Sequence, residues 1–238
     1  MTQRNGVLIQ LEHVSKTFQK GSTLVHAVDD VSLAIHAGEF LAIMAPSGCG
    51  KSTLLQLIGA LETPTSGRII FDGADLAQMN DRALSRFRNR HVGFVFQAYN
   101  LLPELTVLDN VVLPLYYAGV GKRERRERAM EALRQVGLAD RAHHHPAELS
   151  GGQEQRAAIA RALVSQPQIV LADEPTGNLD THIRDQVMRL FRDLNARGTT
   201  LLIVTHDAEV GAAAQHILLM RDGRFVSHAV ASGAQAVT

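Results

Sequence analysis

Residues 40–53 read FLAIMAPSGCGKST, a short apolar run followed by a glycine-rich loop that ends in Lys-Ser-Thr. The uninterrupted apolar run Phe40–Met44 is typical of a parallel strand buried on both faces. Apolar residues at helical spacing follow from Lys51 to Leu61. A strand, a glycine-rich turn and a helix that opens with Lys-Ser form the context that a phosphate-binding loop requires. This stretch therefore predicts nucleotide binding on an α/β sheet.

The glycine-rich loop carries groups that suit a nucleotide triphosphate. Glycines let the backbone approach a phosphate closely, and the N–H groups at a helix start attract anions. Lys51 would reach the β- and γ-phosphates, and the Ser52 hydroxyl would ligate Mg²⁺. Ala45 stands where the strict pattern has glycine, and its single methyl group is small enough to fit. The residues expected to bind phosphate are Ala45, Pro46, Ser47, Gly48, Cys49, Gly50, Lys51, Ser52 and Thr53.

Further strand-like runs predict the architecture around this loop. Leu8–His13 and Val28–Ile35 alternate apolar and polar residues, as half-buried strands do, and Thr181–Ala196 has helical spacing. Asp222-Gly223 between two apolar runs predicts a hairpin turn. Strands that alternate with helices predict an α/β fold with a mostly parallel sheet. The remaining short apolar runs are Val92–Phe96, Ile169–Ala172 and Leu201–Thr205.

The middle of the sequence differs, because strand-like runs are scarce there. We expect a helical insertion subdomain at 99–155, within an α/β core formed by residues 1–98 and 156–238. Lys122–Val136 is a strongly charged helical pattern that begins KRERRER. We interpret it as a solvated helix face with Glu–Arg pairing rather than as a nucleic-acid patch.

Composition disfavours several classes of protein. Lys+Arg and Asp+Glu both number 24, so no global charge points to nucleic acid or to an anionic membrane. Cys49 is the only cysteine, so an intrachain disulfide is impossible and a reducing compartment is expected. No signal segment opens the sequence. The apolar stretches are shorter than the ~20 residues of a spanning helix, so we expect a soluble chain whose membrane role requires a partner.

Four further side chains, at the ends of three strands, are expected at the nucleotide edge of the sheet. Asp173 and Glu174 end the apolar run Ile169–Ala172, and ligands of open α/β sheets bind where strands end. Asp173 suits Mg²⁺, and Glu174 suits a general base that polarises an attacking water. His206 follows another core strand and could hydrogen-bond the γ-phosphate. Gln97 follows a third strand, and its neutral amide could touch Mg²⁺ or the water.

Residues 149–153 read LSGGQ and precede a helical pattern over Glu154–Val164. A hydroxyl and two glycines at a helix start can form an anion site, although an ordinary helix N-cap would explain Ser-Gly-Gly alone. The chain already has one phosphate loop. A second anion site therefore suggests that it serves the nucleotide of another copy.

Together these motifs resemble the nucleotide-binding subunit of an ATP-binding cassette (ABC) transporter, over residues 7–228. The resemblance implies a P-loop NTPase (RecA-like) core with a mostly parallel sheet, an N-terminal antiparallel β region and a helical insertion. It also implies an ATPase that binds ATP and Mg²⁺. Two copies would pack head to tail, with each ATP between the phosphate loop of one copy and the LSGGQ motif of the other.

The resemblance implies roles residue by residue. Phe18 would stack on adenine, although it lacks the hydroxyl of a tyrosine, and Asp180 would lie at the dimer seam. Gln97 would sense both Mg²⁺ and the permease, and His206 would be the switch histidine. Glu154 stands where glutamine is frequent after LSGGQ. The catalytic residues would be Glu174, His206, Gln97 and Lys51, the metal ligands Ser52, Gln97 and Asp173, and the residues acting in trans Ser150, Gly151, Gly152 and Gln153.

Two longer segments, FVFQAYNLLPELTVLDNVVLPL and HPAELSGGQEQRAAIARAL, are similar to the macrolide-exporter and lipoprotein-releasing branch of the family. This implies a separate integral-membrane permease with few spanning helices and a large extracytoplasmic domain, contacted through residues 99–106. The chain would be cytoplasmic, held at the inner face of the cell membrane by that permease. Import and cell-division ATPases share much of these segments. The alternative is therefore a regulatory ATPase of the cell-division type (FtsE-like) that drives a non-transporting membrane partner.

Other interpretations are disfavoured. ABC-type ATPases of DNA repair carry long coiled-coil insertions, and those of translation carry two cassettes; neither feature exists here, and we expect no nucleic-acid partner. An adaptor without hydrolysis would not need both Glu174 and His206. The run His143-His144-His145 invites a metal hypothesis, but consecutive histidines point in different directions and no cluster of Cys or carboxylates accompanies them.

Overall fold

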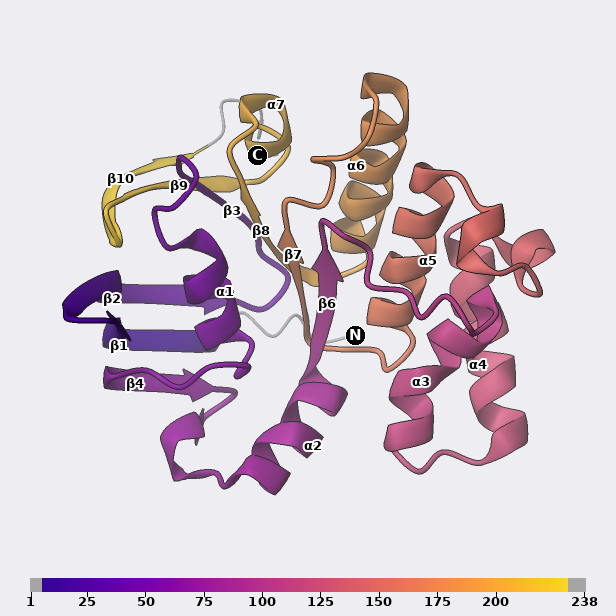
Figure 1. Ribbon diagram of the computed structural model, residues 1–238, viewed down its shortest axis with the longest axis horizontal. Coiled ribbons are helices and arrows are strands. Elements are labelled where there is room, and N and C mark those ends of the chain that lie inside the picture. The colour runs from indigo at the N-terminus through magenta and orange to yellow at the C-terminus, as the bar shows by residue number, and fades with distance from the viewer. Residues whose placement is uncertain (1–5, 231–238) are drawn as a thin grey trace. The chain divides into compact units, whose positions relative to one another are not determined.

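The computed structural model describes residues 6–230 of the chain, which divides into two compact units. The first unit comprises residues 1–84 and 198–238, and the second comprises residues 85–197. Figure 1 shows the elements of both in chain order.

Four strands of the first unit form an antiparallel sheet: β1 (Val7–Lys20), β2 (Thr23–His36), β4 (Ser66–Phe71) and β5 (Ala74–Asp75). The long β1–β2 hairpin lies beside β4 (Figure 1). Its inward face is apolar, and Ile9, Leu11 and Val14 are at most 2% exposed. The predicted N-terminal antiparallel region is therefore confirmed, and its strands are longer than the alternating runs suggested.

The first unit also contains parallel strands built on β3 (Phe40–Met44), which lies between β8 (Thr200–Thr205) and β9 (His216–Arg221). β9 and β10 (Arg224–Val230) form an antiparallel hairpin. Its turn is the predicted Asp222-Gly223, and both residues have positive φ, 48° and 79°, as a type I′ turn requires. The helices of this unit are α1 (Lys51–Ile58), α7 (Ala208–Gly211) and a 3₁₀ turn at Leu76–Gln78.

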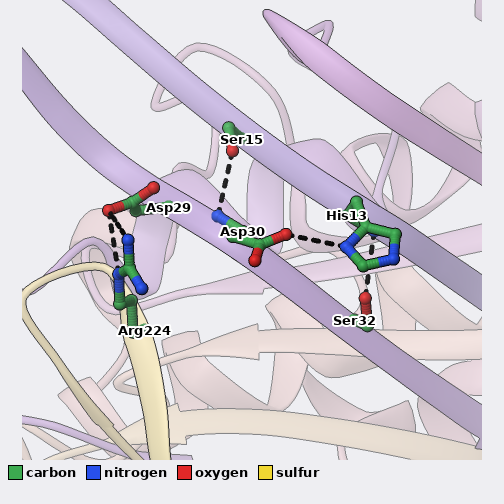
Figure 2. Close-up of polar contacts among 6 residues, drawn as sticks. All are labelled: His13, Ser15, Asp29, Asp30, Ser32 and Arg224. Atoms are coloured by element: carbon green, nitrogen blue, oxygen red, sulfur yellow. Dashed lines mark hydrogen bonds and ion pairs between the residues drawn. The ribbon is translucent and has the colours of Figure 1, made fainter.

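Polar side chains stabilise the irregular part of the β1–β2 hairpin, where the strand register shifts between Leu11 and Val14. His13 Nδ1 lies 2.8 Å from the carboxylate of Asp30, and the N–H of Asp30 donates to the Ser15 hydroxyl at 2.9 Å. Figure 2 shows both contacts. His13 and Asp30 both have positive φ, 50° and 54°, which is uncommon for residues with side chains. These hydrogen bonds therefore accompany a bulge or irregularity in the pairing of β1 with β2.

The β9–β10 hairpin is attached to β2 by one ion pair. The guanidinium of Arg224 donates to a single carboxylate oxygen of Asp29 from two nitrogens, at 2.7 and 2.9 Å (Figure 2). The N–H of Asp29 also donates to the carbonyl of Gly223 at 2.9 Å. Backbone and side chain together thus fix this part of β2 against the hairpin turn.

The second unit is built on two parallel strands, β6 (Val92–Phe96) and β7 (Ile169–Asp173). Helices α3 (Val107–Tyr117), α4 (Lys122–Gln135) and α5 (Gly151–Leu163) pack on one another (Figure 1). α5 also packs closely on β6, since a Cβ on Gly93 would lie 2.5 Å from the carbonyl oxygen of Ala162. The remaining elements are α6 (Thr181–Ala196), 3₁₀ turns at Ala139–Arg141 and Pro146–Glu148, and α2 (Asp81–His91), which crosses the division between the units.

The structure confirms the predicted α/β class, and β3, β6 and α6 have the predicted bounds. α1 is shorter than predicted, since it ends at Ile58 rather than at Leu61. Gly59 follows as its C-cap, and Ala60 has a left-handed φ of 56°, which no helix can continue through.

The predicted limits of the helical insertion, 99 and 155, both fall within the second unit and stay a prediction. Two parts of the predicted core, residues 1–5 and 231–238, lie outside the described residues.

The charged helix α4 has the pairing that its sequence predicts. Arg123 and Glu127 lie 2.8 Å apart, and Glu124 and Arg128 lie 3.6 Å apart, both at i,i+4 spacing. Such pairs stabilise a helix only slightly. They lie on a solvated face of α4, whereas Ala129, Ala132 and Leu133 of the same helix are buried. No helix within residues 6–230 is both long enough and apolar enough to cross a membrane.

Two histidines of the run 143–145 have local roles. Nε2 of His144 lies 3.1 Å from the Arg141 guanidinium, and the N–H of His145 donates to Glu148 at 2.6 Å. In the described part of the chain, no group of three or more His, Cys, Asp or Glu residues is arranged to hold a metal ion.

The close packing of α5 on β6 leads to a stability prediction. Gly93→Ala should lower the free energy of unfolding by about 1–3 kcal/mol, the usual cost of overpacking, because its methyl group would overlap the Ala162 carbonyl. Urea denaturation measures the loss. The matched control is Gly121→Ala, where φ is −59° and a Cβ meets nothing within 4 Å; it should cost less than about 1 kcal/mol. Equal losses in the two variants would contradict this packing.

Candidate functional site

The glycine-rich loop lies between β3 and α1 in the first unit, as predicted. Gly48 and Gly50 have positive φ, 82° and 88°, a conformation that residues with side chains rarely adopt. Gly50 is also required sterically, because a Cβ there would lie 1.8 Å from the carbonyl oxygen of Ala27. Gly50 is the N-cap of α1 and provides no side-chain acceptor. A bound phosphate is therefore a suitable acceptor for N–H groups of the first turn.

Lys51 lies within this loop and is only 7% exposed. Its ammonium group donates to the carbonyl oxygens of Ala45 at 2.8 Å and Pro46 at 3.0 Å. The positive charge is therefore held inside the loop that is predicted to surround the phosphates. Ala45 is itself 6% exposed, so the residue that replaces glycine in the strict pattern is accommodated in the core.

His206 lies beside the start of the same loop. β3 and β8 pair Met44 with Thr205, and the N–H of Ala45 donates to the Thr205 carbonyl at 3.3 Å. His206 is the next residue and its side chain is exposed. Asp207 then caps α7 with its carboxylate. The first unit thus brings the predicted histidine next to the predicted phosphate loop.

Phe18 lies near the tip of the β1–β2 hairpin and is 38% exposed. The Lys16 ammonium is 5.1 Å from the centroid of its ring, which is a cation–π distance. Glu62 and the carbonyl of Thr63 hold that ammonium, each at 2.8 Å. The hydrogen bond from Lys16 lowers the pKa of the Glu62 carboxyl. The ring is thus fixed by a cation while part of its surface stays exposed.

Gln97, Asp173 and Glu174 meet at the carboxyl ends of the strands of the second unit. β6 and β7 pair Phe96 with Asp173, so Gln97 and Glu174 are the next residues on neighbouring strands. Glu174 has a positive φ of 44°, which turns the chain out of the strand at some cost in strain. Asp173 and Glu174 are half-buried, and Gln97 is exposed. Such strained residues cluster at functional sites.

The LSGGQ motif begins α5, and Ser150 is its N-cap. The Ser150 hydroxyl accepts from the N–H of Gln153 at 3.4 Å, and the Gln153 side chain accepts from the N–H of Ser150 at 2.9 Å. This reciprocal pair is a capping box. Ser150 is therefore an ordinary N-cap, which was one of the two interpretations of the sequence. Binding of an anion at the same helix start stays a prediction.

Packing within the chain explains the two glycines of the motif. A Cβ on Gly152 would lie 2.3 Å from Cγ2 of Ile183. A Cβ on Gly151 would lie 3.0 Å from the Tyr99 hydroxyl oxygen. The first turn of α5 is thus held against α6 and against the segment after Gln97.

The structure identifies a further residue that holds the segment after Gln97: Arg161, which the sequence did not identify. Tyr99 and Asn100 have positive φ, 57° and 52°, and the Arg161 guanidinium donates to both of their carbonyl oxygens, at 2.7 Å for Tyr99. Burial lowers the pKa of Arg161, but a guanidinium stays charged. No sequence signal connects residues this far apart in the chain.

Two more residues organise the loop that follows β7. Gln155 is fully buried, and its Nε2 donates to the Pro175 carbonyl at 2.6 Å, which joins α5 to the loop; the sequence did not identify this residue either. Asp180 is the N-cap of α6 and accepts from the N–H of Ile183 at 2.9 Å. The predicted dimer-seam residue therefore also stabilises a helix of its own chain.

Glu154, directly after LSGGQ, has an unfavourable environment for its charge. Burial raises the pKa of its carboxyl above the usual 4.5. Burial, and secondarily the charge of Glu154, raise the pKa of the Tyr99 hydroxyl. A raised carboxyl pKa means that the folded state binds the proton more tightly than the unfolded state. Glu154 therefore contributes less to stability as the pH rises above 4.5.

The sequence profile of the ABC transporter family matches residues 28–177. The uncharacterised ABC transporter ATP-binding protein YknY of Bacillus subtilis (strain 168) is 51% identical over 219 residues, which cover 92% of this chain and 95% of YknY. The macrolide export ATP-binding/permease protein MacB of Burkholderia pseudomallei (strain 1710b) is 48% identical over 221 residues, which cover 93% of this chain but only 34% of MacB.

The fold is also similar to that of a solved ABC cassette. The dimeric, post-hydrolysis structure of the ATP-binding cassette MJ0796, bound to ADP and Pi, matches with a TM-score of 0.88 and 42% identity. The match covers 94% of this chain and 99% of that one. The phosphate loop, the strand ends and the LSGGQ helix described above thus lie in a fold shared with an ABC cassette. The chain belongs to the ABC transporter family and is one of its ATP-binding ATPases.

Proposed function

We propose that the chain hydrolyses Mg²⁺-bound ATP in a head-to-tail dimer with a second copy, and thereby drives a separate membrane permease. The observation that carries the catalytic part is the meeting of Gln97, Asp173 and Glu174 at the carboxyl ends of two parallel strands. Ligands of α/β sheets bind at this edge. An amide, a metal-binding carboxylate and a base are the groups that water attack on a phosphate requires.

Binding of the nucleotide is assigned to the first unit. Residues 45–53 hold the phosphates through backbone N–H groups, and the buried ammonium of Lys51 provides a positive charge for the β- and γ-phosphates. Phe18 stacks on the adenine, supported by the Lys16 cation over its ring. His206, beside the start of the loop, hydrogen-bonds the γ-phosphate.

The oxygen atoms of Ser52, Gln97 and Asp173 fit Mg²⁺, which prefers hard oxygen ligands. Mg²⁺ is usually held by one or two carboxylates together with substrate phosphates rather than by a protein cage. When bound there, the ion would offset the negative charge of the phosphates.

Glu174 is the general base of the proposed reaction. It accepts a proton from the water whose oxygen attacks the γ-phosphorus, and the bond from that phosphorus to the β–γ bridging oxygen breaks. The products are ADP and inorganic phosphate. The left-handed backbone of Glu174 supports this role, since it turns the chain out of the buried strand at the sheet edge.

The LSGGQ motif is assigned to the ATP of the second copy. Its support is the position of Ser150, Gly151, Gly152 and Gln153 at the start of α5, where N–H groups and the helix dipole favour an anion. The chain needs no second phosphate site for its own nucleotide. The solved MJ0796 structures are dimers, and Asp180 would lie at the corresponding seam.

The permease partner is assigned to the macrolide-export or lipoprotein-release type. MacB is named an ATP-binding/permease protein, and the part of it similar to this chain is 34% of its length. In the proposed assembly, a separate membrane subunit would take the place of the remaining part of MacB. Residues 99–106 would contact it; Leu102 is 46% exposed there, and Arg161 fixes the start of the segment. The chain would then work at the cytoplasmic face of the cell membrane, without a nucleic-acid partner.

The base assignment predicts the effect of Glu174→Gln. Glutamine cannot accept the proton, so ATP turnover should fall by about 10²-fold or more while ATP binding is retained. Size-exclusion chromatography should detect an ATP-bound dimer that the wild type forms only transiently. The same change at an exposed position, Glu131→Gln on α4, is the control and should keep full turnover. Unchanged turnover in Glu174→Gln would refute the assignment.

The partner assignment predicts what the trapped protein captures. Tagged Glu174→Gln with Mg²⁺ and ATP, isolated from gently solubilised native membranes, should retain a permease with few spanning helices and a large extracytoplasmic domain. Mass spectrometry of the co-purifying proteins measures this, with Lys51→Ala as the control that should lose the partner. A non-transporting membrane partner would favour the regulatory alternative instead. Ribosomes or DNA-repair proteins would contradict the transport role.

A further inference from the structure

Gln97 is joined to a residue that the proposed reaction does not use. Asn178, in the loop after β7, donates from Nδ2 to the backbone carbonyl of Gln97 at 3.1 Å. Its Oδ1 accepts from Nε2 of Gln97 at 3.3 Å. Both residues are exposed, so this pair is made in contact with solvent and is not forced by burial in a core.

The two hydrogen bonds determine which atom of each amide faces the other. A backbone carbonyl can only accept, so Asn178 must direct its Nδ2 at Gln97 and keep its Oδ1 for the side chain. Asn178 Oδ1 can also only accept, so Gln97 must present Nε2 to it. An exchange of nitrogen and oxygen in either amide would bring two acceptors, or two donors, together. The orientation therefore follows from the chemistry of the backbone carbonyl.

The next residue in the loop makes room for this arrangement. A Cβ on Gly177 would lie 2.8 Å from Nε2 of Gln97, so any larger residue would displace the amide. The N–H of Gly177 donates to the carbonyl of Glu174 at 3.1 Å, which closes a turn directly after the proposed base. The amide of Gln97 and the backbone of Glu174 are thus held by one short loop.

We propose that Asn178 is a positioning residue that orients the Gln97 amide so that its Oε1 is presented to the metal ion. The inference rests on the proposed function of Gln97. With Nε2 engaged by Asn178, Oε1 lies on the opposite side of the amide, and within residues 6–230 no side chain or backbone group donates to it. Mg²⁺ takes oxygen ligands, whereas an amide nitrogen is only a donor. Asn178 thus selects the one orientation of Gln97 in which it can act as a ligand.

Removal of Asn178 should therefore weaken the metal-dependent part of nucleotide binding. In Asn178→Ala the exposed Gln97 amide can rotate, and part of the population presents Nε2 instead. One net hydrogen bond corresponds to a factor of about three to ten. We expect the ratio of ATP affinity with Mg²⁺ to that with EDTA to fall by about this factor, while affinity in EDTA is unchanged.

Isothermal titration calorimetry of ATP on the full chain tests this, in the Glu174→Gln background so that ATP is not consumed. Asn178→Ala is compared with Gln97→Ala and with the double variant. If Asn178 acts through Gln97, the ratio falls in each single variant and the double variant is no worse than Gln97→Ala. Gly177→Ala, which displaces the same amide, should lower the ratio as well. Gln186→Ala removes another exposed amide, bonded to His182 on α6, and should leave the ratio unchanged.

Three results would overturn the inference. The first is an unchanged affinity ratio in Asn178→Ala. The second is that Asn178→Ala lowers the ratio as much in the Gln97→Ala background as it does alone, and the third is that it lowers ATP affinity as much in EDTA as in Mg²⁺. Failure of the proposed function itself would look different, because the parent protein would then show no Mg²⁺ dependence of ATP binding. Thermal melting of each variant verifies that the exposed substitutions leave the fold intact.

Discussion

A strand that is buried on both faces can carry polar side chains only where it ends, and both units depend on this constraint. β3, β7 and β8 are apolar and buried along nearly their whole length, because an unpaired polar group in such a strand would cost several kcal/mol, on the order of 2–7. Charge and hydrogen-bonding capacity therefore gather at the carboxyl ends. The phosphate loop and His206 are found there in the first unit, and Asp173 with Glu174 in the second.

A second constraint is the close packing around glycines of two motifs, the phosphate loop and LSGGQ. Gly50 lies against the Ala27 carbonyl, and Gly152 lies against Ile183. Both positions belong to motifs in which glycine is usually explained by access of a phosphate. In this chain the glycines are required even before a ligand binds, since a methyl group would collide with the protein itself. A glycine of the phosphate loop and a glycine of LSGGQ thus serve packing as well as recognition.

The local parts of this fold could be predicted from the sequence, and the long-range parts could not. β3, α6 and the Asp222-Gly223 turn were predictable because each depends on neighbouring residues: an apolar run, helical spacing and a dipeptide that tolerates positive φ. The position of Asp173 and Glu174 at the end of β7 was predictable in the same way, because they follow an apolar run. Contacts such as that of Arg161 with the Tyr99 carbonyl depend on backbone groups far away in the chain, and every residue type has the same backbone carbonyl. No sequence pattern distinguishes the carbonyl that Arg161 will meet.

The Ser150 hydroxyl and the Gln153 amide, which belong to the proposed site at the start of α5, already have hydrogen-bond partners within the chain. Both side chains take part in the capping box, so neither can bind a phosphate independently of that hydrogen-bond pair. The Ser150 oxygen accepts from the backbone, which leaves its O–H proton as the donor for an anion. The side chain of Gln153 cannot turn toward an anion without leaving the N–H of Ser150 unpaired. A phosphate at this helix start would therefore be bound mainly by the hydroxyl proton and by backbone N–H groups of the first turn.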